Sequence, residues 1–153
     1  MYDLGVLIKD IDNFDMDTFD GRLIFQKTIH ILQSFDINLG YYYSWYLRGP
    51  YCPDLTRDGF ELKDVIEKVP KINIEFADSK DQSRYNSFKR FMLDKKNDSK
   101  QLEIASSICF LHKEVGLGKR NVLDLTEGKR REIEMNECEQ IWAELEIYGV
   151  VRD

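Results

Sequence analysis

Cysteine, proline and histidine are scarce in this sequence, and long apolar runs are absent. The 153 residues include three cysteines, three prolines and two histidines. Cys52, Cys109 and Cys138 are odd in number and far apart, which favours a reduced, cytoplasmic protein over a disulfide scaffold. No apolar run approaches the roughly 20 residues that span a bilayer, so no membrane partner is expected. The acidic start MYDLGVLIKDID lacks the basic region of a secretory signal.

Sequence signatures of catalysis and cofactor binding are also missing. The chain has no P-loop, no dinucleotide-binding glycine fingerprint and no G-x-S-x-G elbow. Cys109 and His112 form a single C-x-x-H pair, whereas a zinc site needs a second pair. We therefore expect no metal, no cofactor and no enzyme, although His30 and His112 would be the obvious bases of one.

Charge is unevenly distributed along a chain whose net charge is −6. Residues 1–20 hold six Asp and one Lys, which gives −5, and residues 132–153 hold seven acids and one Arg, which gives −6. Residues 79–100 hold seven bases and three Asp, which gives +4. Acidic ends argue against a protein that coats nucleic acid, and they suit a basic protein partner.

Apolar spacing predicts a single α+β domain over residues 1–153 that is mainly α, with six or seven helices. Helical periodicity covers about 3–12, 20–34, 53–69, 81–94, 99–115, 121–127 and 136–148. Two short stretches, 42–47 and 71–76, have the composition or the alternation of strands, and we expect them to pair as a small antiparallel sheet.

Aromatic residues concentrate between residues 41 and 51. They are Tyr41, Tyr42, Tyr43, Trp45, Tyr46 and Tyr51. Both faces of the expected strand are aromatic, so we expect both to be covered, and a core with polar edges is favoured over a platform for nucleobases. Arg48-Gly49-Pro50 is expected to end the strand. The expected core comprises Ile24, Ile31, Trp45, Leu47, Leu62, Ile104, Ile108, Trp142 and Leu145.

Three stretches resemble the YwgA-like family of uncharacterised bacterial and archaeal proteins. They are Gly21-Arg22, Gln26-Lys27 and YSWYLRGPYCP at residues 43–53, where the family has G-R, Q-K and an aromatic strand ending in Y-G-P-Y-S. Here Arg48 replaces the tyrosine and Cys52 replaces the serine. LEIASSICFL at 102–111 is similar to a later family helix, and residues 22–60 are more distantly similar to the SocA or Panacea antitoxin domain.

The resemblance implies a small, compact helical domain, for which a winged-helix-like arrangement stays open. It also implies that the domain works through protein contacts, with antitoxin or defence roles. It carries over no catalytic residues. We predict a non-enzymatic protein-interaction module, antitoxin-like or an accessory subunit, with a protein partner and with homo-oligomers left open. The expected interaction site is the corner Arg48, Gly49, Pro50 and Tyr51, with Arg22 and Lys27 near it. The alternative is that this corner only ends a strand.

A DNA-binding regulator is the alternative function. The helices between residues 100 and 148 have the order of a helix-turn-helix unit. Lys119, Arg120, Lys129, Arg130 and Arg131 would contact phosphates. The last helix carries Glu137, Glu139, Glu144 and Glu146, which phosphates would repel, so the basic loops would have to make the contact.

Overall fold

Two buried helices, α2 (Phe19–Ser34) and α5 (Ser99–Cys109), form the centre of the protein. The computed structural model describes residues 3–12 and 14–153. Every residue from Ile24 to Leu32 and from Leu102 to Cys109 is buried, and the two helices pack against each other. Since α2 is buried on all sides between Ile24 and Leu32, the polar side chains of that stretch need partners inside the fold.

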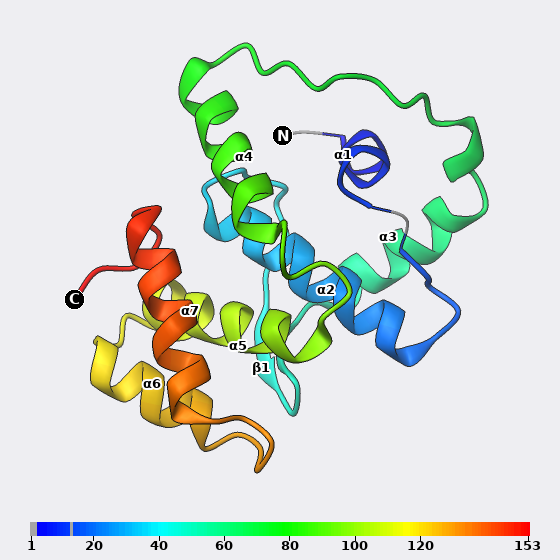
Figure 1. Ribbon diagram of the computed structural model, residues 1–153. Coiled ribbons are helices and arrows are strands. Elements are labelled where there is room, and N and C mark those ends of the chain that lie inside the picture. Colours follow the sequence, from blue (N-terminus) through cyan, green and yellow to red (C-terminus); the bar gives the residue numbers. More distant parts are fainter. Residues whose placement is uncertain (1–2, 13) are drawn as a thin grey trace.

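The remaining helices cover this central pair. α3 (Pro53–Lys63) and α4 (Ser79–Met92) pack against α2, whereas α6 (Lys119–Glu127) and α7 (Met135–Ile147) pack against α5 (Figure 1). α1 (Leu4–Ile11) is joined to α4, because Asp10 accepts hydrogen bonds from the Tyr85 hydroxyl at 2.5 Å and from Lys89 Nζ at 3.0 Å. Two short turns, η1 (Ile66–Lys68) and the π-helical η2 (Phe110–Glu114), follow α3 and α5.

The described residues confirm an α+β fold that is mainly α, with seven α-helices and a two-stranded antiparallel sheet. The expected strand pairing is wrong: β1 (Ser44–Tyr46) pairs with β2 (Gly49–Tyr51), and residues 71–76 form no strand. Ser44 lies opposite Tyr51 and Tyr46 opposite Gly49, with Leu47 and Arg48 as the turn. A hairpin closes with less loss of chain entropy than a pairing across about 30 residues.

Most of the expected core is buried. Ile24, Ile31, Ile104, Ile108, Trp142 and Leu145 all lie in the apolar interior, and Leu62 is half-buried. The prediction that Trp45 and Leu47 belong to the core is wrong, since their side chains are 40 % and 91 % exposed. The hairpin extends past α5 at the lower side of Figure 1, so its faces are not both covered.

None of the helices within residues 3–12 and 14–153 has both the length and the apolar character that crossing a bilayer requires. Cys52, Cys109 and Cys138 are free, buried thiols.

Candidate functional site

The hairpin backbone lies directly against α2 and α5. Gly49 has φ +96°, and an added Cβ there would come within 2.9 Å of Ser107 Oγ and 3.4 Å of Lys27 Nζ. Gly49 and Pro50 thus belong to β2 instead of ending a strand. Both the backbone angle and the close approach require glycine at this position.

Two glutamine side chains of α2 hold the chain on either side of the hairpin. Gln26 donates from Nε2 to Cys52 O at 2.7 Å and accepts from Cys52 N at 3.0 Å. Gln33 accepts from Leu39 N at 3.2 Å and Tyr41 N at 3.0 Å, and it donates to Tyr41 O at 3.0 Å. These amides satisfy backbone groups that have no neighbouring strand.

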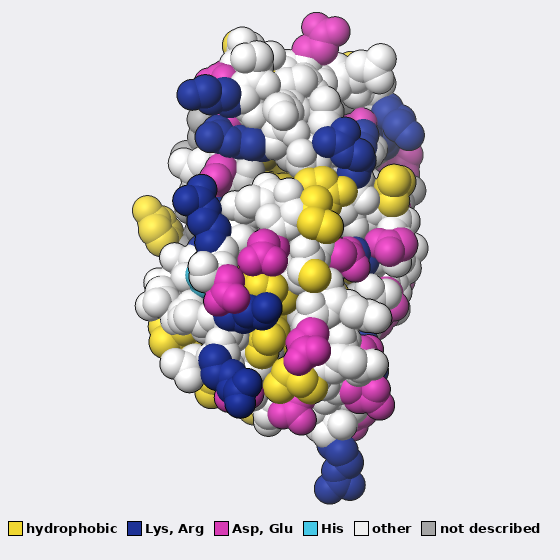
Figure 2. All heavy atoms as spheres, turned by 60° about the vertical axis from the view of Figure 1, so that its left-hand side comes forward, with side chains coloured by type: hydrophobic (Ala, Val, Ile, Leu, Met, Phe, Trp, Pro, Cys, Tyr) yellow, Lys and Arg dark blue, Asp and Glu magenta, His cyan; other side chains and the backbone are white. Residues whose placement is uncertain are grey.

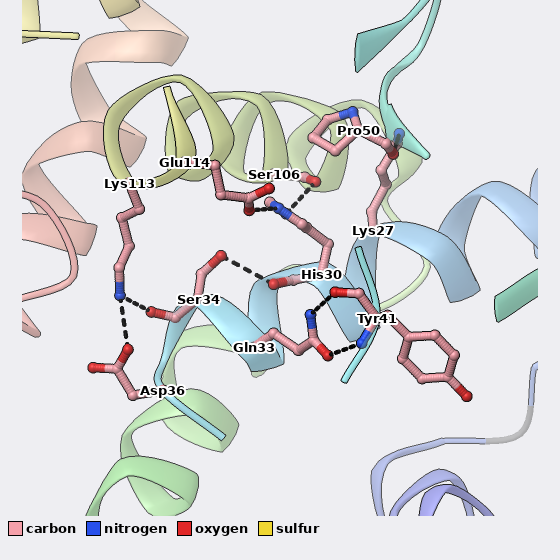
Figure 3. A network of polar contacts seen from close by, with 10 residues as sticks. All are labelled: Lys27, His30, Gln33, Ser34, Asp36, Tyr41, Pro50, Ser106, Lys113 and Glu114. Carbon is pink, nitrogen blue, oxygen red and sulfur yellow. Dashed lines mark hydrogen bonds and ion pairs between the residues drawn. The ribbon is translucent and has the colours of Figure 1, made fainter. Parts of the chain in front are cut away.

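Lys27 holds the hairpin itself. Its Nζ donates to Pro50 O at 2.7 Å (Figure 3), and the residue is only 2 % exposed. Burial lowers the pKa of Lys27 to about 7, Glu103 opposes that shift, and Lys129 and Arg48 add to it. The Lys27 ammonium, which contacts the backbone of β2, therefore loses its proton near neutral pH.

The buried carboxylate of Glu103 is paired with Arg130. Glu103 is 3 % exposed and accepts from Arg130 Nε at 3.2 Å and from Arg130 Nη2 at 2.9 Å. This two-point geometry compensates for the burial of both charges. Arg130 is thereby engaged in holding the loop after α6 against α5.

Lys129 fixes the tip of the hairpin. Its Nζ donates to Tyr46 O at 3.2 Å and to Leu47 O at 2.9 Å, and it lies 4.3 Å from the centre of the Trp45 ring. The Trp45 ring also stacks on Phe110, with a centroid separation of 5.6 Å. Hydrogen bonds, a cation–π contact and ring stacking thus hold the tip to the body.

Large apolar side chains remain exposed on this fixed backbone. Tyr42 and Leu47 are each 91 % exposed, Tyr46 is 50 % exposed and Trp45 is 40 % exposed. Arg48, which directly precedes β2 in the sequence, is also exposed. We call these five residues, Tyr42, Trp45, Tyr46, Leu47 and Arg48, the hairpin surface.

The residues expected at the corner separate into two locations. The structure brings together Lys27, Arg48, Gly49, Pro50 and Tyr51. Arg22 lies elsewhere, since its Nη1 donates to Met16 O at 3.0 Å and its guanidinium lies 6.0 Å from the Phe60 ring centre. Tyr51 is half-buried, and its hydroxyl accepts from Thr56 Oγ1 at 2.9 Å.

The residues expected to bind nucleic acid are largely engaged within the fold. Lys129 and Arg130 hold the hairpin tip and Glu103, as described above. Lys119 Nζ lies 5.9 Å from the Trp142 ring centre and 4.0 Å from Asp153. Arg120 and Arg131 are exposed.

Charges of both signs are mixed on the side of the molecule that carries α4, α6 and α7. Figure 2 shows Lys and Arg side chains there interspersed with Asp and Glu side chains. Phosphate tracking relies on a continuous basic groove. This face lacks such a groove among the residues described.

His30 joins a buried polar network that the sequence did not indicate. Its ring has no exposed surface; Nδ1 lies 2.9 Å from Ser106 Oγ and Nε2 lies 2.5 Å from Glu114 Oε1 (Figure 3). Burial lowers the pKa of His30, and Glu114 opposes that shift. Since the partners lie 76 and 84 residues away, no local spacing could have linked them.

Hydrogen bonds link a serine to a histidine and that histidine to a glutamate, as in a hydrolase triad. The network differs from such a triad in how far a substrate can reach the serine. Ser106 and His30 both have no exposed surface, so a substrate does not reach the hydroxyl in this structure. The network instead joins α2 to α5 and to η2, whose π-helical turn carries Glu114.

A cleft of about 590 Å³ opens beside this network. It is lined by Gln33, Ser34, Asp36, Asn38, Tyr41, Tyr42, Tyr43, Lys113 and Glu114. Lys113 Nζ donates to Ser34 O at 2.5 Å and to Asp36 Oδ1 at 3.1 Å. The ammonium and the Gln33 amide are thus used to fix the chain after α2.

His112 is also bonded on both ring nitrogens. Nδ1 donates to Leu117 O at 2.8 Å and Nε2 accepts from Arg152 N at 3.2 Å, so the neutral ring joins two backbone segments. Burial raises the pKa of Cys109 to about 12. Within the described ranges, no group of three or more His, Cys, Asp or Glu side chains could hold a metal ion.

Comparison with models of protein families, with curated proteins and with solved structures found no match. The resemblance to the YwgA-like family and to the SocA domain, and the winged-helix-like arrangement, therefore stay predictions.

Proposed function

We propose that this protein is a non-enzymatic protein-interaction module, antitoxin-like or an accessory subunit, and that it binds its partner through the hairpin surface. One observation carries the proposal. Four large apolar side chains are exposed on a backbone that is already fixed by Lys27 and Lys129. A binding surface that is ordered before contact loses less conformational entropy on binding.

The composition of the hairpin surface supports a protein partner. Tryptophan, tyrosine and arginine are the residues that most often dominate binding energy at protein interfaces. Trp45, Tyr46 and Arg48 supply all three, and Leu47 at the turn is almost fully exposed. Adjoining exposed apolar groups on a soluble domain mark interaction sites.

Charge around the hairpin indicates the kind of partner. Arg48 is exposed, and Lys129 lies against the same turn. Both lie close enough to Lys27 to lower its pKa. A complementary partner would carry an apolar pocket with a rim of carboxylates. This replaces the expectation from the acidic chain ends, which favoured a basic partner.

The test is capture of a partner from the native host by tagged protein, with a matched pair of variants. Leu47→Asp places a charge at the hairpin turn, and Ile147→Asp does the same at another exposed apolar residue, 81 % exposed at the end of α7. We expect a stoichiometric partner that Leu47→Asp loses and Ile147→Asp retains. Equal retention by both variants, at unchanged circular dichroism, would reject the hairpin as the binding surface.

DNA binding by a regulator is the second candidate. The observation that favours it is that Lys129 lies over the exposed ring of Trp45 and that the exposed Arg48 follows Tyr46 by two residues, a mixture of basic and aromatic residues found where nucleic acid bases stack. Binding would depend strongly on salt. Arg130 should be left intact in its test, because Glu103 needs it.

The DNA test compares wild type with a double variant, Arg48→Ala with Arg131→Ala, at low and moderate salt. Binding that weakens with salt and is lost in the variant would favour the regulator. Absence of binding at low salt, or binding that the variant leaves unchanged, would remove this candidate.

A further inference from the structure

Residues 70–75 have the side-chain pattern of a strand but no strand partner within residues 3–12 and 14–153. Among the described residues, none forms a backbone hydrogen bond with Pro70 through Glu75. In Figure 1 this segment runs as an open arch between η1 and α4, at the opposite end of the molecule from the hairpin. Open backbone N–H and C=O groups of this kind are a template for another strand.

Side chains along the arch alternate as in a half-covered strand. Ile74 is half-buried and packs on the core, whereas Lys71, Asn73 and Glu75 are exposed. Ile72 has the same place as Ile74 in this alternation, but it is 50 % exposed. An added strand would cover Ile72 by cross-strand contact.

We propose that the arch pairs with the same segment of a second copy of this chain, in an antiparallel register centred on Asn73. The charged and apolar side chains of the segment are complementary to those of a second copy. In that register Lys71 lies opposite Glu75 of the partner subunit, and Ile72 lies opposite Ile74 of the partner subunit. Opposite charges and apolar pairs directly across a strand pair both stabilise it.

Neighbouring registers lack this complementarity. A shift by one residue in one direction places Ile72 opposite Asn73 of the partner subunit, and a shift in the other direction places Ile72 opposite Glu75 of the partner subunit. The two-fold axis at Asn73 also makes the contact isologous, so the dimer is closed. Pro70 begins the segment, where a proline is tolerated.

Charge reversal tests the register directly. Lys71→Glu or Glu75→Lys alone would place like charges opposite each other, and the double variant would restore opposite charges in reversed order. Lys71 also interacts electrostatically with Asp10, so Glu75→Lys is the cleaner single variant. Lys68→Glu, at an exposed lysine on η1, controls for a change of charge outside the arch.

The measurement is sedimentation over a series of protein concentrations. We expect a monomer–dimer equilibrium in wild type and in Lys68→Glu, a weaker dimer in each single variant, and recovery in the double variant. A wild type that stays monomeric overturns the proposal. A dimer that the single variants leave unchanged, or that the double variant fails to recover, overturns it as well.

A cross-link supplies an independent readout. Asn73→Cys would put two thiols opposite each other at the axis, where paired strands bring Cα atoms to roughly 4.5–5.5 Å, within reach of a disulfide. The three native cysteines are buried, so they do not compete. We expect a covalent dimer under mild oxidation from Asn73→Cys and none from Lys68→Cys; equal yields from the two would overturn the register.

Discussion

Replacement of the buried Lys27 by methionine should change how stability depends on pH. Lys27 Nζ is bonded to Pro50 O inside the fold, and burial lowers the pKa of Lys27 from 10.5 to about 7. Between these two values the unfolded chain holds a proton that the folded chain has lost. Stability therefore rises with pH across this window, and below about pH 7 both states are protonated and the gain is absent.

The expected size follows from the shift. Each pH unit inside the window contributes roughly 1.4 kcal/mol. Between about pH 7 and about pH 9.5, Lys27 should add about 3 kcal/mol to the free energy of unfolding. Burial also raises the pKa of Tyr41 and of Tyr85. Because these tyrosines ionise first in the unfolded chain, they reduce stability above about pH 10, so the comparison stops below that value.

Urea unfolding at several pH values between about 7 and about 9.5 measures the effect. The wild type should gain about 3 kcal/mol more than Lys27→Met over that range. Lys68→Met, which removes an exposed lysine, controls for the loss of one lysine from the chain. Equal slopes in wild type and Lys27→Met would refute the reasoning, since Lys27 would then titrate alike in both states.

Three further changes test the packing around the hairpin and the core by urea unfolding. Gly49→Ala should cost at least about 1 kcal/mol more than Gly116→Ala, because both have positive φ but only Gly49 would bring Cβ against neighbours; equal costs would contradict this. Arg130→Ala should cost about 3–5 kcal/mol by leaving Glu103 buried without its partner, and Glu103→Leu with Arg130→Met should recover most of that loss. Trp142→Ala should cost about 3–5 kcal/mol, and a loss well under about 1 kcal/mol would show that the ring is not core.

The helices could be predicted from the sequence because their apolar spacing is local. The pattern of 99–115 indicated a buried helix, and α5 with η2 occupies that stretch. The two strand predictions failed for a different reason. Alternation indicates a strand backbone but not its neighbour, so residues 71–76 kept their pattern without forming a strand, and residues 42–47 folded back onto Gly49–Tyr51.

The candidate site could be predicted only in part. The resemblance brought out Gln26-Lys27 and the Gly49-Pro50 corner as separate stretches, and the structure joins them by side-chain bonds to the backbone. Exposure of Trp45 and Leu47 depends on how far the hairpin extends beyond α5, which is a tertiary property. No local pattern in the sequence indicates how far the hairpin extends.

Hydrogen exchange of the protein with and without its captured partner tests the central claim most directly. The claim is that the hairpin surface, fixed by Lys27 and Lys129, is where the partner binds. We expect backbone amides between residues 42 and 51 to gain protection in the complex, while those of residues 70–75 stay unchanged. Protection that leaves residues 42–51 unaffected, with the partner bound elsewhere, would contradict the account.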